Sequence, residues 1–380
     1  MTAAAALGRS WQGWATVAAA GVLTVVCVAL LVHTVRRRRR GHHPAALLAV
    51  TGALLCVVLV AVTGLLAVGV GTGYLSDWRS LATAGSAVAD DPTEVPTGTP
   101  ATPPTPTTAT TGATWEVTVP STERGVPDSA TYLYVPPGYS QDPTAHYPVL
   151  YMLHGSPGTG ADWFAAGHLD EVLDQLVTSG KIPPVVVVSP DLDLGPTDEP
   201  LDLPAPGALR ETFVVDDVVP WADAHLRTLP DRADRVVGGM SAGGLGALLI
   251  GLRHQSTFAG VVSLMPYLEP ESAGLRAVPS ALAANSPLEV IDRTTYVDPL
   301  PVFLGVPGGD DPTEGQRIAE ALDAAGVPEH LQRYDQAEHD WAGAELMSPD
   351  AITWVVDQLG WSAPAPAGTP GPTPAAATTG

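Results

Sequence analysis

Two long apolar runs dominate the first 80 residues of the chain. Residues 15–35 and 45–70 are almost wholly apolar, and each run is long enough for the roughly 20 residues with which an α-helix crosses a bilayer. Between them, residues 36–43 contain five consecutive arginines, a pattern that favours the cytoplasmic side of a membrane. The pattern predicts a two-helix transmembrane anchor over residues 1–80, so that the protein is a multi-pass cell-membrane protein whose remaining chain is extracellular.

The composition then changes to proline and threonine. Residues 81–113 carry little apolar surface and many prolines, which is typical of an extended, semi-rigid linker. Residues 362–380 have a similar Pro/Ala/Thr composition and are predicted to be a disordered tail.

Residues 114–361 show a different periodicity, in which short apolar strands alternate with amphipathic helices. This alternation predicts an α/β domain with a mostly parallel central sheet and helices on both faces. One stretch, residues 265–300, has no clear period and is predicted to be a lid or a substrate-shaping insertion. The expected strands cover 115–119, 130–135, 147–153, 185–188, 236–240, 258–264, 301–306 and 331–334, and the expected helices 169–179, 211–229, 245–252, 313–325 and 351–359.

A Gly-x-Ser-x-Gly turn lies in the middle of this domain, with Gly239, Ser241 and Gly243 at its defining positions. A β-branched apolar run precedes the turn and a helical run follows it. A serine at such a strand-to-helix corner is exposed above the sheet, and only glycine lets the flanking chain pack so closely. Because of this context, we interpret Ser241 as a nucleophile and not merely as a helix N-cap.

A serine hydroxyl needs a base within hydrogen-bond reach and a carboxylate that orients the base. In hydrolases with this elbow the order along the chain is serine, acid, histidine. Three histidines follow Ser241, namely His254, His330 and His339. Only His339 comes directly after the last predicted strand, so it is the predicted base.

The acid is expected in the loop after the strand at 301–306, where two aspartates are adjacent. We favour Asp311, because the stretch from Gly308 to Pro312 resembles the Gly-x-x-Asp loop of many α/β-hydrolases, and keep Asp310 as the alternative. The other aspartate would then cap the following helix.

Acyl transfer also requires donors for the oxyanion, usually backbone N–H groups. We expect them from Ala242, which follows the nucleophile, and from Ser156 in the loop after the strand at 147–153. His154 lies in that loop before the elbow, so we expect it to shape the loop and not to act as the base.

Charge and cysteine content narrow the function further. The chain has 40 acidic and 18 basic residues, a net charge of −22, and most basic residues of the first 80 positions lie in the arginine-rich stretch. An acidic surface repels nucleic acid and anionic headgroups, which argues against a nucleic-acid partner. The two cysteines, Cys27 and Cys56, lie in the apolar N-terminal runs, so the α/β domain has no disulfide or cysteine metal site.

Four ordered motifs together resemble the esterase D, or "putative esterase", family of α/β-hydrolases, which includes feruloyl esterases, enterochelin esterases and mycolyltransferases. The resemblance covers about residues 115–360. It implies an α/β-hydrolase fold and carboxylic-ester hydrolysis or acyl transfer by Ser241, His339 and an aspartate, without metal or cofactor. The motifs are Tyr132–Tyr139, Tyr147–Gly155, Gly239–Gly244 and His339–Trp341.

The leading prediction is therefore a membrane-anchored, extracellular serine esterase whose ester substrate could be an envelope lipid or glycolipid. Two alternatives stay open. One is an acyltransferase that acts on envelope sugars or lipids. The other is a non-catalytic module that only binds envelope material.

Overall fold

The computed structural model describes residues 3–39, 46–71, 93–94, 99–122 and 124–362. The predicted C-terminal tail lies outside the described residues except for its first position. Four positions of the arginine-rich stretch and most of the first half of the proline-rich linker also lie outside them.

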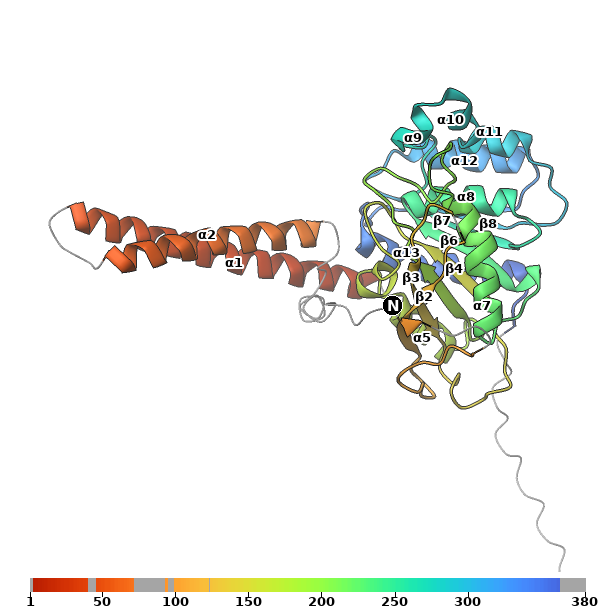
Figure 1. The fold of residues 1–380 in the computed structure, drawn as a ribbon, viewed down its shortest axis with the longest axis horizontal. Coiled ribbons are helices and arrows are strands. Elements are labelled where there is room, and N and C mark those ends of the chain that lie inside the picture. The colour runs from red at the N-terminus through yellow and green to blue at the C-terminus, as the bar shows by residue number, and fades with distance from the viewer. Residues whose placement is uncertain (1–2, 40–45, 72–92, 95–98, 123, 363–380) are drawn as a thin grey trace, which may run out of the picture.

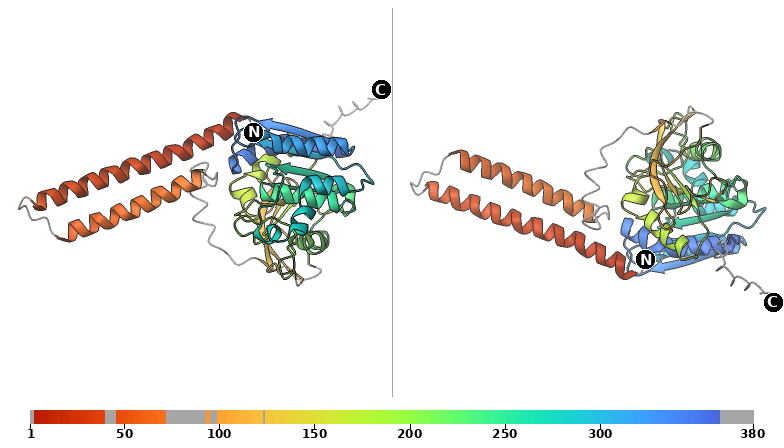
Figure 2. Two further views of the ribbon diagram at one scale, coloured as in Figure 1. Left: turned by 90° about the horizontal axis from the view of Figure 1, so that it is seen from above. Right: turned by 90° about the horizontal axis from the view of Figure 1, so that it is seen from below.

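The N-terminal residues form two long helices, α1 (Ala3–Arg39) and α2 (Ala46–Gly71), which lie side by side as a hairpin (Figure 2). The hydroxyl groups of Thr24 and Thr63 are 3.0 Å apart across the two helices. Within the described residues, no helix is both long and apolar enough to span a membrane. The two-helix anchor therefore stays a prediction.

The α/β domain is built on a sheet that has nine strands in the described part of the chain (Figure 1). Its order is β1-β2-β3-β5-β4-β6-β7-β8-β9, with β3 antiparallel to β2 and β5 and all other neighbours parallel. The strands are β1 (Thr93–Glu94), β2 (Ala113–Val119), β3 (Ser129–Val135), β4 (Val149–Leu153), β5 (Val186–Pro190), β6 (Arg235–Met240), β7 (Gly260–Leu264), β8 (Val302–Pro307) and β9 (Glu329–Tyr334).

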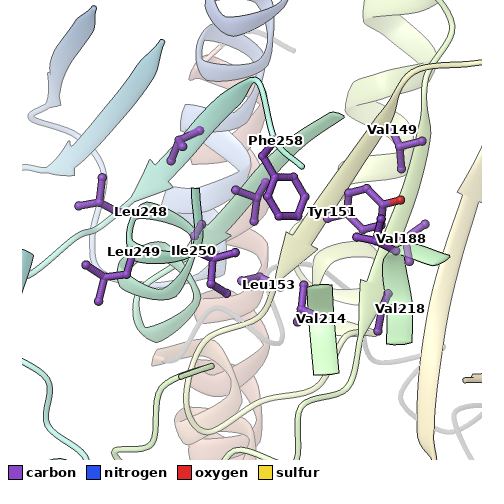
Figure 3. Packing of buried hydrophobic residues seen from close by; sticks show 14 of the residues in the cluster. Val149, Tyr151, Leu153, Val188, Val214, Val218, Leu248, Leu249, Ile250 and Phe258 are labelled. Carbon is purple, nitrogen blue, oxygen red and sulfur yellow. The ribbon is translucent and has the colours of Figure 1, made fainter. Parts of the chain in front are cut away.

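The parallel strands are apolar on both faces because helices cover both faces of the sheet. In β4, Val149, Tyr151 and Leu153 belong to one core, whereas Leu150 and Met152 belong to the other. Figure 3 shows the first core, where helix α8 packs on the sheet. This alternation confirms the predicted α/β class with a mostly parallel sheet.

Each core is closed by its own helices. The first contains apolar residues of the α6–η1–α7 helix, α8 and α12, and the second contains those of α4, α5 and α13. The bounds are α4 (Asp162–Ala165), α5 (Leu169–Thr178), α6 (Arg210–Phe213), π-helix η1 (Val214–Val218), α7 (Val219–His225), α8 (Ala242–Arg253), α12 (Pro312–Ala324) and α13 (Trp341–Leu359), with a short 3-10 turn, η2 (Arg232–Asp234), before β6.

Two helices differ from the expected ones. The helix predicted at 211–229 ends at His225 and contains a π-helical turn that ends at Val218, close to Pro220, which has no N–H to donate to the preceding turn. Helix α13 begins at Trp341, well before the predicted start at residue 351, and continues through Pro349. Burial of Trp341 and Met347 in the second core accounts for the extra turns.

The second half of the predicted linker is not a free spacer, because it packs against the domain. Ala101 and Thr107 are each only 3% exposed. The N–H of Thr107 donates to the Ser140 hydroxyl at 3.0 Å, and the N–H of Ser140 donates back to the Thr107 hydroxyl at 2.9 Å. Further along, the N–H of Gly112 donates to Asp174 at 2.9 Å. These contacts offset the conformational entropy that the segment loses when it becomes ordered, which its composition alone would not do.

Residues 265–300, which have no clear period in the sequence, form three short helices that the structure describes: α9 (Ala273–Arg276), α10 (Pro279–Ala284) and α11 (Pro287–Arg293). Leu275 and Ile291 anchor this segment in the first core. The helices are too short to show a clear repeat in the sequence.

Replacement of Phe258 by alanine is expected to destabilise the domain by about 3–5 kcal/mol, because it removes a fully buried ring from the first core. The ring packs edge-on against Tyr151, with centroids 5.7 Å apart. Urea unfolding followed by tryptophan fluorescence measures the loss. The matched control is Val297→Ala, at a side chain that is 72% exposed, which should change stability by less than about 0.5 kcal/mol. Equal midpoints for both variants would contradict the assigned core.

Candidate active site

The turn between β6 and α8 holds Ser241 in a strained conformation. Its φ is +57°, a region that residues other than glycine rarely adopt. A Cβ atom at Gly239 would overlap the carbonyl oxygen of Gly243, and one at Gly243 would overlap the carbonyl oxygen of Leu153. The N–H of Ser241 donates to the carbonyl of Leu264 in the neighbouring strand at 2.9 Å. The two glycines therefore allow the close packing that fixes the serine at the corner, as predicted.

Ser241 is one end of a chain of hydrogen bonds through His339 to Asp310. The Ser241 hydroxyl lies 2.9 Å from Nε2 of His339, and Nδ1 of His339 lies 2.7 Å from a carboxylate oxygen of Asp310. The serine follows β6, the aspartate follows β8 and the histidine follows β9. Because these strands are parallel, their carboxyl ends lie along one edge of the sheet and bring together residues far apart in sequence.

The prediction of Asp311 as the carboxylate next to the histidine is wrong, and Asp310 takes that position. Asp311 is the N-cap of α12, where its side chain accepts a hydrogen bond from the N–H of Thr313 at 2.9 Å. The hydrogen bonds from Thr313 lower the pKa of Asp311. Pro312 at the first helical position was the sequence signal, since proline there marks the preceding residue as the N-cap.

The loop that carries His339 is fixed at both ends. Behind it, Asp340 caps α13 by accepting a hydrogen bond from the N–H of Gly343 at 2.7 Å. Ahead of it, the carbonyl of Ala337 accepts a hydrogen bond from the N–H of Gly308 at 3.0 Å. The acid loop and the histidine loop are therefore joined directly by a backbone hydrogen bond.

The two residues predicted to supply oxyanion donors, Ser156 and Ala242, line the same pocket as Ser241. The loop of Ser156 passes close to Ser241, because a Cβ atom built on Gly155 would lie 3.5 Å from the Cβ of Ser241. The Ser156 hydroxyl donates to the carbonyl of Gly195 at 2.6 Å. The side chain of Ser156 thus holds the loop in place.

His154 shapes this loop, as expected from its place in the chain. Its ring is fully buried, and Nε2 accepts a hydrogen bond from the N–H of Leu192 at 3.1 Å. Nδ1 is 2.8 Å from the carbonyl of Gly155, to which the Nδ1–H of this neutral tautomer donates. Burial lowers the pKa of His154, so the ring stays neutral and joins the loops after β4 and β5.

The pocket in front of Ser241 has a volume of about 560 Å³. Its walls come from the loop after β5, from the first residues after β7 and from the connection between β8 and α12. Sequence reasoning missed four of the residues that line it: Asp198, Tyr267, Glu271 and Glu314. They lie outside the motifs, three of them in loops without periodicity, so no sequence signal marked them.

A buried carboxylate, Glu199, holds two of these walls together. It accepts hydrogen bonds from the hydroxyl of Tyr267 at 3.0 Å and from the N–H groups of Glu271 and Ser272 at 2.5 and 3.2 Å. Burial raises the pKa of Glu199, although the three donors act in the opposite direction. The segment after β7 is therefore tied to the loop after β5 next to the pocket.

Curated proteins with similar sequences match this chain over only part of their length. The chain is 28% identical over 224 residues to an endo-1,4-beta-xylanase/feruloyl esterase of Xylanibacter ruminicola. The aligned region covers 57% of this chain and 27% of that protein. It is 35% identical over 118 residues to an esterase of Mycobacterium tuberculosis, and this aligned region covers 31% of this chain and 25% of that protein. The chain thus spans about a quarter of the length of these relatives.

Solved structures with a similar fold match over more of their length. A ferulic acid esterase has a TM-score of 0.57 at 25% identity, which covers 66% of this chain and 99% of the other. An S-formylglutathione hydrolase from Agrobacterium tumefaciens has a TM-score of 0.55 at 20% identity, which covers 68% and 99%. The model of the family described as "Putative esterase" matches residues 127–345. The chain therefore belongs to this esterase family.

Proposed function

We propose that this protein is a serine hydrolase of carboxylic esters that works through an acyl-enzyme on Ser241. The observation that carries the proposal is the continuous chain of hydrogen bonds from Ser241 through His339 to Asp310 at the edge of a pocket. Family membership supports ester chemistry. The relatives named as esterases support it as well, although each is matched over only part of its length.

In this mechanism Nε2 of His339 takes the proton of the Ser241 hydroxyl as the oxygen attacks the ester carbonyl carbon. Asp310 orients the ring through Nδ1–H and stabilises the imidazolium that forms. The N–H groups of Ser156 and Ala242 would donate to the oxyanion, at about 3 kcal/mol for each donor. His339 then gives the proton to the leaving alcohol, and water attacks the acyl-enzyme with His339 again as base.

The alternatives are less well supported. A non-catalytic binding module would not need the serine and the histidine within hydrogen-bond distance, yet they are 2.9 Å apart. Acyl transfer uses the same residues as hydrolysis and differs only in the acceptor of the acyl group. No described contact favours a sugar or lipid acceptor over water.

We also propose, from the sequence, that the N-terminal part attaches the domain to a membrane with the pocket on the extracellular side. The apolar runs and the arginine-rich stretch between them support this. In α1 and α2, large apolar side chains are exposed to solvent, among them Val22, Val25, Leu54 and Val57. Such a surface is typical of a membrane or protein interface.

Replacement of Ser241 by alanine is expected to reduce hydrolysis of p-nitrophenyl acetate and butyrate by at least about 10³-fold, because the nucleophile is lost. Initial rates and the mass of an adduct with a serine-directed phosphonate measure this. Ser280→Ala, at an exposed serine of α10, serves as the matched control and should keep both. Equal, negligible rates in the native protein and the Ser241 variant, without an adduct, would refute the proposed function.

The two aspartates give a sharper test of the geometry. Asp310→Asn should lower kcat/KM for a neutral ester by about 10³- to 10⁴-fold, because the amide cannot hold His339 in the required tautomer. Asp311→Asn should cause a far smaller loss, since asparagine also caps helices well. Circular dichroism establishes that both variants are folded. A larger loss for Asp311→Asn than for Asp310→Asn would overturn the assignment.

Membrane attachment predicts that the full chain stays in the membrane pellet after an alkaline carbonate wash, whereas a chain without residues 1–80 is released. The physical reason is burial of the apolar runs in lipid. Release of the full chain by the wash would contradict the proposal. On intact cells, protection of the domain from added protease would contradict the extracellular orientation.

A further inference from the structure

The pocket in front of Ser241 is lined by acidic groups, although an ester is uncharged at its reacting atoms. Of the described residues that line it, none is a lysine or an arginine, and His339 is the only histidine. The acidic residues among them are Asp198, Glu271, Asp310, Asp311 and Glu314.

Only part of this negative charge is compensated. Asp198 is paired with Arg210, whose Nη2 lies 3.1 Å away, and Asp310 is bound to the histidine. Glu271, Asp311 and Glu314 form no ion pair in the part of the chain that the structure describes. The remaining carboxylates therefore give the pocket a negative potential.

These carboxylates are close enough to affect one another. The pKa of Glu314 is raised, first by burial and then by the charges of Asp311 and Asp310, with a contribution from Glu271. Arg317, one turn further along α12, opposes the shift but does not cancel it. Carboxylates from the start of α12 and from the segment after β7 thus contribute to one electrostatic field in the pocket.

The position of the field relative to the reacting bond follows from the mechanism. His339 must give its proton to the leaving alcohol, so the alcohol departs beside its ring. Asp311 and Glu314 lie on the same connection as Asp310, which holds that ring. Glu271, Asp311 and Glu314, called the acidic wall below, therefore line the same pocket as the ring beside which the alcohol departs.

We propose that this protein selects esters whose alcohol part carries a positive charge, such as an ammonium or quaternary ammonium group, and disfavours anionic alcohols. Glu271 and Glu314 are the specificity-determining residues. This inference rests on the proposed function and names the substrate class of that same pocket. An anionic alcohol such as a sugar acid would be repelled by the same wall.

Three acetyl esters of similar size test the proposal with the purified full chain in nonionic detergent. Acetylcholine is cationic, 3,3-dimethylbutyl acetate is its neutral isostere, and acetylisethionate is anionic. We expect kcat/KM to be at least about fivefold higher for the cation than for the isostere at low ionic strength, and lowest for the anion. The preference should fall towards unity near 1 M salt, where the Debye length is about 3 Å.

Variants that remove charge test whether the preference for the cationic ester depends on Glu271 and Glu314. The double variant Glu271→Gln/Glu314→Gln should reduce the cation-to-isostere ratio to below about twofold, and Glu314→Gln alone should reduce it in part. Glu320→Gln is the matched control, because it removes one charge from an exposed position of the same helix that does not line this pocket. It should leave the ratio and the basal activity unchanged.

The outcomes separate this inference from the proposed function. If the neutral isostere is hydrolysed in a Ser241-dependent way but the cation is not preferred, the charge selectivity is refuted and the esterase stands. If none of the three esters, nor p-nitrophenyl acetate, is turned over by Ser241, the proposed function itself fails. A preference that survives both the double variant and high salt would also overturn the role of the two glutamates.

Discussion

The structure depends on the close packing of the elbow between β6 and α8. Ser241 can keep its φ of +57° only because Gly239 and Gly243 leave room for the strand and helix to meet. The hydrogen bond from Ser241 to Leu264 fixes the corner against β7. In the proposed mechanism, a serine held rigidly at this corner reduces the ordering that catalysis would otherwise require.

Around this corner, each partner is positioned by a separate device. Capping of α12 by Asp311 leaves Asp310 facing the histidine, and the backbone hydrogen bond between Gly308 and Ala337 keeps the two loops together. A buried, neutral His154 ties the loop of Ser156 to the loop after β5. The reacting groups therefore lie on loops, but each loop is fixed by hydrogen bonds to the sheet or to a helix.

The pocket walls, unlike the elbow, are positioned by contacts between loops. Glu199 brings the segment after β7 next to the loop after β5, and this contact places Tyr267 and Glu271 at the pocket. Substrate selection then depends on charges from loops that have no motif, in accordance with the general rule that specificity lies in variable loops on a fixed scaffold. The same fold could thus act on esters of very different charge.

The sequence alone determined the fold class, the place of Ser241 at the elbow and the histidine that lies next to it, because strand periodicity, glycine at a strained turn and chain order are local signals. Its preference for Asp311 over Asp310 was wrong, because adjacent residues differ only in the direction in which the backbone points their side chains, and the N-cap of α12 decides that direction. Nor did the sequence reveal that residues 99–112 pack against the domain or that Glu199 joins two walls. These contacts join residues distant in sequence, so only the tertiary structure decided them.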